Sequence, residues 1–420
     1  MFYSLYIDPG TGSMLFSILM GAAAASFFAF RALIIKAKAF FSGGRRVAEK
    51  NSVPYIIYCE GKQYFNVFKT VLEEAEIRKT SVVYLTSAKD DPVFGMKFEY
   101  IKPEYIGEGA KAFARLNMLN ADFVLMTTPG INVYQLKRSP LVKHYSHILH
   151  APSDAVMYRL FGLDYFDSIL LTGSYQARDI RALEKLRGLP EKQLVVVGCP
   201  YLDVYASKIS ALSRVPPPPP FTVIVSPSWG PSALLSKYGE RLLSPLAKTS
   251  WRIIVRPHPQ SKKSEASLLE SLAKKYKDFS NIEWDYEQEN IYSLSKSDVM
   301  ISDFSGVIFD YIFLFNKPVL YVKQNIDLRP YDADDLYQEE AGGPLENLWQ
   351  FKTVREIGVE LKEESFEQIE DVIKASISSA SLNEARASAK ETAWERRGES
   401  GRLIFDFMTG FLNAGVDASA

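Results

Sequence analysis

The chain has few of the residues that build disulfide frameworks and metal centres. Its 420 residues include only two cysteines, Cys59 and Cys199, and four histidines. Their spacing matches neither a disulfide framework nor a zinc site. A formal net charge of -1 gives the chain no overall attraction to nucleic acid. These absences fit a protein of a reducing compartment that needs no metal or other cofactor.

Lysine and arginine are also missing from the first 30 residues. No residue between Asp8 and Arg31 is charged, and residues 14–30 are almost wholly apolar or small. A helix needs roughly 20 such residues to span a bilayer, so we predict one transmembrane helix. The basic residues of segment 31–50, opposed only by Glu49, place the rest of the chain in the cytoplasm. A buried core helix and a cleaved signal peptide, which needs a basic segment first, are the alternatives.

From residue 51 onward, short apolar runs rich in Val, Ile and Tyr alternate with amphipathic stretches. This pattern is typical of parallel strands buried on both faces. The predicted strands are 55–58, 81–85, 121–126, 146–149, 168–171, 194–197, 222–225, 251–255, 281–284, 299–301 and 319–322, with helices at 63–76 and 307–315.

Five consecutive prolines at 216–220 divide this pattern. They cannot lie in a helix or a central strand, and they indicate a spacer rather than a motif for an SH3-like partner. We predict an α/β fold of two Rossmann-like domains facing a cleft, which is the glycosyltransferase-B type of architecture. The parts are an anchor with its basic segment (1–50), a first domain (51–215), the linker (216–220), a second domain (221–362) and a helical segment (363–420).

Arg256-Pro257-His258-Pro259 follows the predicted strand 251–255, at the sheet edge where open α/β folds bind ligands. The two prolines restrict the backbone to a rigid turn, so the imidazole of His258 would hold one position against a ligand. Arg256 beside it would grip a phosphate with two hydrogen bonds. A purely structural turn is the alternative.

Ser-Asp-Phe-Ser-Gly at 302–306 follows another predicted strand and runs into the predicted helix 307–315. A helix start offers free N–H groups and a positive dipole end, which suit a phosphate. We expect Ser305 to cap the helix and donate its hydroxyl to a phosphate, and Gly306 to let the backbone approach closely. With His258, this motif predicts a nucleotide-diphosphate site.

Three further side chains complete the predicted site. Asp303 would orient loop N–H groups or cap the helix, and Asp310 would face the cleft. His150 ends a predicted strand beside that cleft, where a histidine is well placed as a general base. His144 and His147 are spaced with His150 as on a helical metal-binding face, but the strand pattern argues against one, and we expect no metal.

These motifs resemble the CDP-glycerol glycerophosphotransferase family of teichoic-acid and capsule synthesis. The family pattern is an Arg-Pro-His-Pro turn, a Ser-Asp run that ends in Asp-Tyr, and then Lys-Pro. It is matched here at 256–259, 297–311 and 317–321, and more weakly at His150, 197–203 and 226–229. The chain departs from the family at 149–154, where a glycine and basic residues are missing, and at Gly306, where the family has a second serine.

The resemblance implies a membrane-associated enzyme with this two-domain fold, working at the inner face of the membrane. It would transfer glycerol phosphate, or a related polyol phosphate such as ribitol phosphate, from a CDP-polyol to a hydroxyl of a lipid-linked acceptor, releasing CMP. It implies that His150 is the base and that His258 contacts the donor's diphosphate, supported by Ser305 and Gly306. Two other functions remain open: a nucleotide-sugar glycosyltransferase of the same fold, and an inactive membrane-tethered binding protein.

Overall fold

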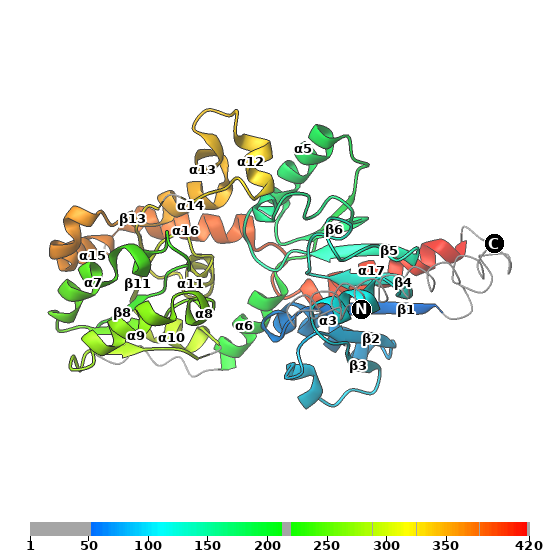
Figure 1. The fold of residues 1–420 in the computed structure, drawn as a ribbon, viewed down its shortest axis with the longest axis horizontal. Helices are drawn as coiled ribbons and strands as arrows, with labels where there is room; N and C mark the ends of the chain where they lie inside the picture. Colours follow the sequence, from blue (N-terminus) through cyan, green and yellow to red (C-terminus); the bar gives the residue numbers. More distant parts are fainter. Residues whose placement is uncertain (1–51, 212–219, 288, 325, 378, 418–420) are drawn as a thin grey trace, which may run out of the picture. The chain divides into compact units, whose positions relative to one another are not determined.

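The computed structural model describes residues 52–211, 220–287, 289–324, 326–377 and 379–417 (Figure 1). Residues 54–420 form one compact unit. The predicted anchor at 14–30 and all but the last proline of the predicted linker lie outside the described residues. No helix in the described ranges is long and apolar enough to cross a membrane.

The first half of this unit is built on a seven-stranded parallel sheet with the order β3-β2-β1-β4-β5-β6-β7. Its central strands, from β2 to β6, are almost wholly buried, as expected for a sheet covered by helices on both faces. The strands are β1 (Val53–Cys59), β2 (Val82–Thr86), β3 (Ile101–Tyr105), β4 (Asn120–Met126), β5 (Leu141–Ile148), β6 (Ser168–Leu171) and β7 (Gln193–Val196).

The second half is built on a six-stranded parallel sheet with the order β10-β9-β8-β11-β12-β13. In both sheets the strand order reverses next to the first strand, between β1 and β4 and between β8 and β11. Such a switch point is where open α/β sheets bind ligands. The strands are β8 (Thr222–Val225), β9 (Arg252–Val255), β10 (Ile282–Trp284), β11 (Val299–Ser302), β12 (Val319–Tyr321) and β13 (Val359–Glu360).

Helices connect most successive strands and cover the sheets (Figure 1). The α-helices are α3 (Phe65–Ile77), α4 (Ala110–Leu116), α5 (Ala177–Arg187), α6 (Pro200–Ala211), α7 (Leu234–Ala247), α8 (Ser261–Ser264), α9 (Ala266–Lys275), α10 (Ile291–Lys296), α11 (Val307–Phe315), α12 (Asp332–Tyr337), α13 (Gly343–Asn347), α14 (Trp349–Ile357), α15 (Ile369–Ile377), α16 (Ala380–Ala393) and α17 (Ser400–Asp417). Short 3-10 turns lie at Lys62–Tyr64, Pro92–Gly95, Ala155–Met157, Ser174–Gln176 and Glu363–Gln368.

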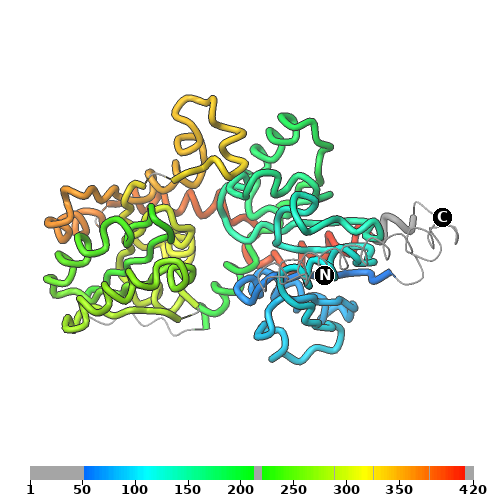
Figure 2. The backbone as a smooth tube through the Cα atoms, in the orientation of Figure 1, coloured from blue at the N-terminus to red at the C-terminus, as the bar shows by residue number. Residues whose placement is uncertain are grey.

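The C-terminal helices do not form a separate body. Ile369 and Ile373 of α15 pack into the core of the second sheet, whereas Ile404 and Met408 of α17 pack into the core of the first. Figure 2 shows this return as the red end of the tube lying beside the blue α3. The chain therefore crosses between the two halves a second time. Its helix α17 then packs into the same core as β1 and α3.

Asp203 of α6 fixes the point where the chain re-enters the first half. Its buried carboxylate accepts hydrogen bonds from Nε1 of Trp394 at 2.9 Å and from the backbone N–H of Gly398 at 2.9 Å, and also from the hydroxyl of Ser400, which starts α17. A carboxylate at a helix start stabilises the helix through its free N–H groups and its dipole. The stretch 197–203, matched in sequence to the family, thus ends in a residue with a structural role.

A cluster of buried apolar side chains joins the two halves. It includes Cys199, which precedes α6, Leu202 from α6, Ile308 and Ile312 from α11, and Trp394 after α16. Both cysteines of the chain are buried and free, and burial raises the pKa of the Cys199 thiol, so it packs as a small apolar side chain. This cluster lies behind α11 and holds the start of that helix in place.

Candidate active site

Two cavities share the start of α11, and a third adjoins both of them. The first, which we call the His150 cavity, has a volume of about 440 Å³ and is lined by His150, Trp229, Ser305 and Gly306 among others. The second, the Asp310 cavity, has a volume of about 350 Å³ and shares Ser305 and Gly306 with the first. A third of about 740 Å³ shares the turn 256–259 with the second and Trp229 with the first. The predicted site residues therefore line connected space.

The start of α11 presents open backbone to these cavities. The amides of Gly306 and Val307 have no hydrogen-bond acceptor among the described residues, and a Cβ added at Gly306 would meet no atom within 4 Å. One part of the prediction was wrong, because the N-cap residue is Gly306 and no side chain caps the helix. The hydroxyl of Ser305 is therefore not used by the helix. Two amides and a hydroxyl at a helix start form a ready anion site.

His258 is held by its own turn in a single protonation pattern. Its Nδ1 accepts a hydrogen bond from the backbone N–H of Gln260 at 3.1 Å, so Nδ1 cannot carry the proton and the neutral ring carries it on Nε2. Burial lowers the pKa of His258, while the charge of Glu265 opposes that shift. The ring stacks near Trp229, with centroids 6.3 Å apart, and lines the Asp310 cavity. His258 is thus a neutral N–H donor aimed by a rigid turn.

Arg256 already has protein partners. Its guanidinium forms a buried ion pair with Asp285 and donates to the backbone carbonyl of Glu287 at 2.6 Å. Asp285 in turn accepts from the hydroxyl of Ser293. The predicted two-pronged grip on a phosphate therefore competes with this ion pair, and the structure gives Arg256 a clear role in tying the turn after β9 to the loop after β10.

Asp303 orients loop amides, which is one of the two roles predicted for it. Its carboxylate oxygens accept from the backbone N–H groups of Ser228 and Leu234, each at 2.8 Å. Burial raises the pKa of Asp303, and the donated hydrogen bonds oppose that rise. Asp303 thereby ties the loop after β11 to the loop after β8, on the two sides of the switch point.

Asp310 lies one turn into α11 and lines the Asp310 cavity. The hydroxyl of Tyr201 donates to one carboxylate oxygen at 2.5 Å, and Nδ2 of Asn290 donates to the other at 2.8 Å. Burial raises its pKa to about 6, against the two donors. Each oxygen keeps a further lone pair for a ligand hydroxyl.

His150 lies just after β5, half-buried, and lines the cavity named after it. Its Nδ1 is 3.0 Å from the hydroxyl of Tyr158, which leaves Nε2 as the nitrogen available to a ligand. Burial lowers the pKa of His150 to about 4, so the ring is neutral at physiological pH. His258 and His150 thus line different cavities that share the start of α11.

The other two histidines are core residues of β5. Nε2 of His144 lies 2.8 Å from the hydroxyl of Ser168, and its ring stacks on Phe123. His147 is fully buried, and its Nε2 lies 3.1 Å from the hydroxyl of Tyr158. Among the described residues no group of three His, Cys, Asp or Glu side chains is placed to hold a metal ion.

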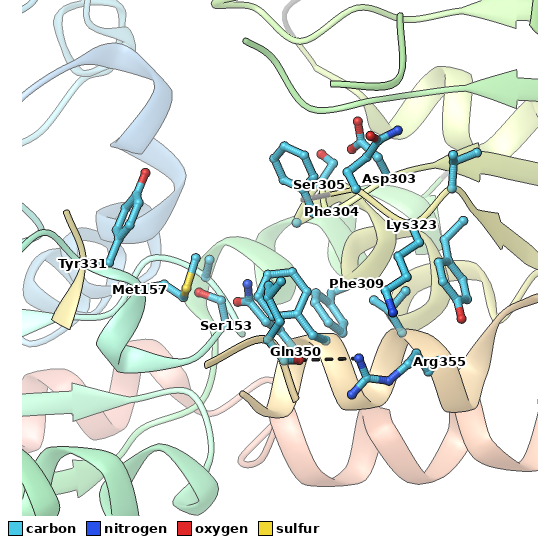
Figure 3. Close-up of a pocket in the computed structure, with 18 of the residues that line it drawn as sticks. Ser153, Met157, Asp303, Phe304, Ser305, Phe309, Lys323, Tyr331, Gln350 and Arg355 are labelled. Atoms are coloured by element: carbon cyan, nitrogen blue, oxygen red, sulfur yellow. Dashed lines mark hydrogen bonds between the residues drawn. The ribbon is translucent and has the colours of Figure 1, made fainter. Parts of the chain in front are cut away.

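The His150 cavity also contains polar and aromatic side chains that the sequence did not single out. Figure 3 shows Ser305 and Asp303 on one wall, Met157 and Tyr331 on the facing wall, and Gln350 and Arg355 along α14. Lys323 and Gln324, which follow β12, also line this cavity. Gln324 is buried, and neither atom of its amide has a partner within the described residues. This cavity offers positive charge, amide groups and apolar walls together.

Known structures with a similar fold cover nearly the whole chain. The wall teichoic acid polymerase TagF, from a crystal soaked with CDPG, aligns with 92% of this chain and 98% of its own at 14% identity and a TM-score of 0.54. A putative UDP-N-acetylglucosamine 2-epimerase from Listeria monocytogenes aligns with 86% of this chain and 97% of its own at 12% identity and a TM-score of 0.56. MnaA of S. aureus with UDP aligns with 86% of this chain and 97% of its own, at 14% identity and a TM-score of 0.54. At these identities the likeness shows the fold, and the predicted glycosyltransferase-B type of architecture is confirmed.

The sequence itself matches a protein-family model. Residues 171–345 match the family described as CDP-Glycerol:Poly(glycerophosphate) glycerophosphotransferase, whereas no curated protein matches the chain significantly. This region, which is less than half of the chain, carries the sequence pattern of that family, as the motifs indicated. His258, Ser305 and Gly306 lie inside the matched region, and His150 lies before it.

Proposed function

We propose that the protein transfers glycerol phosphate, or a related polyol phosphate, from CDP-glycerol to a hydroxyl of a membrane-linked acceptor in cell-envelope polymer synthesis. The observation that carries this proposal is the placement of the start of α11. Its open amides lie where the His150 cavity and the Asp310 cavity meet, with a neutral donor histidine on one side and a candidate base on the other. The negative charge of a diphosphate suits the open amides and the positive dipole end at this helix start.

In this proposal the two ends of the donor occupy the two cavities. The acceptor hydroxyl must lie beside the base, so the acceptor and the transferred polyol phosphate belong in the His150 cavity. The nucleoside then belongs on the other side of the diphosphate, in the Asp310 cavity. There the carboxylate of Asp310 has lone pairs for ribose hydroxyls, and Asn290 and Glu289 provide further polar contacts.

The reaction follows from this placement. The acceptor oxygen attacks the β-phosphorus in line and loses its proton to Nε2 of His150, and the bond from the β-phosphorus to the bridging oxygen breaks. CMP leaves with the electron pair of that bond. Nε2–H of His258 and the amides of Gly306 and Val307 stabilise the charge on the phosphate oxygens, and positioning and electrostatics carry most of such a transfer.

The identity of the released nucleotide tests this function. Detergent-solubilised full-length protein, given CDP-glycerol and a membrane lipid extract as acceptor, should release CMP. A parallel panel of nucleotide sugars should release no nucleoside diphosphate. Release of UDP from that panel, without CMP from CDP-glycerol, would instead favour a glycosyltransferase of the same fold. Repeating the assay with EDTA tests the expectation that no metal is required, because that expectation predicts an unchanged rate.

We further propose that residues 14–30 are a retained transmembrane anchor with the enzyme domains on the cytoplasmic side. The uncharged run and the basic segment after it support this proposal. An anchor would hold the site at the surface where a lipid-linked acceptor meets a soluble donor. Full-length protein should stay with membranes after washing in alkaline carbonate, and a form that begins at residue 52 should be released. Release of the full-length protein would contradict the anchor.

A further inference from the structure

The base candidate His150 is linked to two other side chains, Tyr158 and His147, by hydrogen bonds. The hydroxyl of Tyr158 lies 3.0 Å from Nδ1 of His150 and 3.1 Å from Nε2 of His147. The rings also meet edge to face, with centroid distances of 5.9 Å from Tyr158 to His150 and 5.1 Å from Tyr158 to His147. One hydroxyl therefore bridges two histidines, one lining the cavity and one fully buried.

The protons of these three hydrogen-bonded side chains, His150, Tyr158 and His147, can be arranged in two ways. Burial raises the pKa of Tyr158 far above its ordinary value, so the hydroxyl keeps its one proton. Among the described residues its proton has no acceptor other than the two ring nitrogens, so the hydroxyl donates to one histidine and accepts from the other. If it donates to His147, His150 carries its proton on Nδ1 and its Nε2 is bare. If it donates to His150, the proton of His150 is on Nε2, which can then only donate.

We propose that Tyr158 accepts from Nδ1–H of His150 and donates to Nε2 of His147, and so holds His150 in the tautomer that can take a proton from the acceptor hydroxyl. This inference rests on the proposed function, because only a base needs a bare Nε2. Tyr158 and His147 are positioning residues here, since neither touches the reacting atoms. The arrangement does for His150 what a buried carboxylate does for the histidine of a hydrolase triad.

The proton stays on His150 after the transfer. Moving it along the chain would place a positive charge on His147, which is fully buried with its Nδ1 unpartnered among the described residues. Burial lowers the pKa of His147 well below its ordinary value, and the neighbouring His150 adds to that shift. The hydrogen-bonded row of His150, Tyr158 and His147 therefore orients the base and does not carry the proton away.

The backbone explains how Tyr158 keeps its place. Its carbonyl accepts from the N–H of Asp332 at 3.0 Å, Arg159 forms a bridge with Tyr331, and the N–H of Leu160 donates to Pro330 at 3.1 Å. The segment that carries Tyr158 is thus fixed to the second half of the molecule, while His147 and His150 belong to the first. The orientation of the base depends on contact between the two halves.

Nitrogen NMR of the full chain in detergent tests the arrangement directly. The protein has only four histidines, so four single variants assign every ring signal in a sample labelled with ¹⁵N-histidine. In the wild type, Nδ1 of His150 should be protonated and Nε2 bare. Tyr158→Phe should shift His150 toward the opposite tautomer and lower kcat about tenfold, the effect of one hydrogen bond, with KM for CDP-glycerol unchanged.

Variants of the neighbouring residues separate orientation from packing. His147→Phe removes the acceptor of the Tyr158 proton, so Tyr158 should turn to His150 and produce the same tautomer shift. His147→Gln keeps an amide oxygen near the position of Nε2 and should retain the wild-type tautomer. Tyr64→Phe is the matched control for the tautomer, because the Tyr64 ring also contacts His150, at a centroid distance of 5.1 Å, without a hydrogen bond between them.

Two results would overturn the inference. A bare Nδ1 and a protonated Nε2 on His150 in the wild type would mean the reverse arrangement, with His150 as a donor. If Tyr158→Phe left both the tautomer of His150 and the rate unchanged, Tyr158 would act only as a packing residue. The tautomer measured in both cases does not depend on the proposed function, which fails separately if His150→Ala still releases CMP at the wild-type rate.

Discussion

His150→Ala is expected to lower the rate of CMP release from CDP-glycerol about 10²- to 10⁴-fold, the usual effect of losing a general base. The substitution removes the nitrogen that we propose takes the acceptor's proton, and it leaves the start of α11 and the turn of His258 untouched. KM for CDP-glycerol should change little, since the donor's diphosphate is held by other groups. The measurement is steady-state CMP release with the lipid acceptor, with folding checked by circular dichroism.

The pH dependence of the wild-type rate gives an independent check on His150. The base must be unprotonated to work, and burial holds its pKa at about 4. Tyr64 and Tyr158 contact its ring, and His147 is bonded to the same Tyr158 hydroxyl. None of the three carries a negative charge that would raise this pKa. The rate should therefore stay level as the pH falls from 8 to about 5, and decline only below that.

His150→Gln is the matched control, because it keeps hydrogen-bonding capacity but cannot accept a proton. It should be as slow as His150→Ala. A glutamine variant close to wild type in rate would mean that His150 binds or orients the acceptor, and an acid limb near pH 6.5 would mean that burial does not set its pKa.

Much of the fold could be predicted from the sequence because the strands are short, apolar and buried. Segments 168–171 and 222–225 were predicted with the bounds that β6 and β8 have, and 307–315 with those of α11. The two missed strands, β3 and β13, are edge strands. β3 contains Lys102, Pro103 and Glu104, which suit a sheet edge but hide the apolar pattern that identifies central strands.

The candidate site could be predicted only as far as local sequence decides it. Strand ends followed by a rigid turn or a helix start can be recognised in one segment, and His258, Ser305 and Gly306 lie in such segments. Partners from distant segments leave no local signal. Asp285 as the partner of Arg256, and Tyr158 between His147 and His150, depend on how loops from different elements meet. Ser305 was wrongly expected to cap α11, because the N-cap residue is Gly306, which has no side chain to cap the helix.

His258→Ala is expected to lower the rate of CMP release about 10²- to 10³-fold, as when one donor is removed from an oxyanion site. In the proposed reaction Nε2–H of His258 donates to the diphosphate, because Nδ1 is occupied by the N–H of Gln260. The loss should appear mainly in kcat, because charge on the phosphate oxygens grows toward the transition state. The measurement is the same CMP assay, with the apparent melting temperature as a check on folding.

The protonation state of His258 decides between a donor and a charged phosphate ligand. Burial lowers its pKa below the ordinary value, so the ring is neutral at pH 7 and still donates from Nε2. The wild-type rate should not fall as the pH rises from 6 to 8, because the working form carries no charge to lose. His258→Gln keeps an N–H near the position of Nε2 and should recover part of the activity lost in His258→Ala. A rate that falls through pH 6.5, with no recovery by glutamine, would show that the charged imidazolium is the working form.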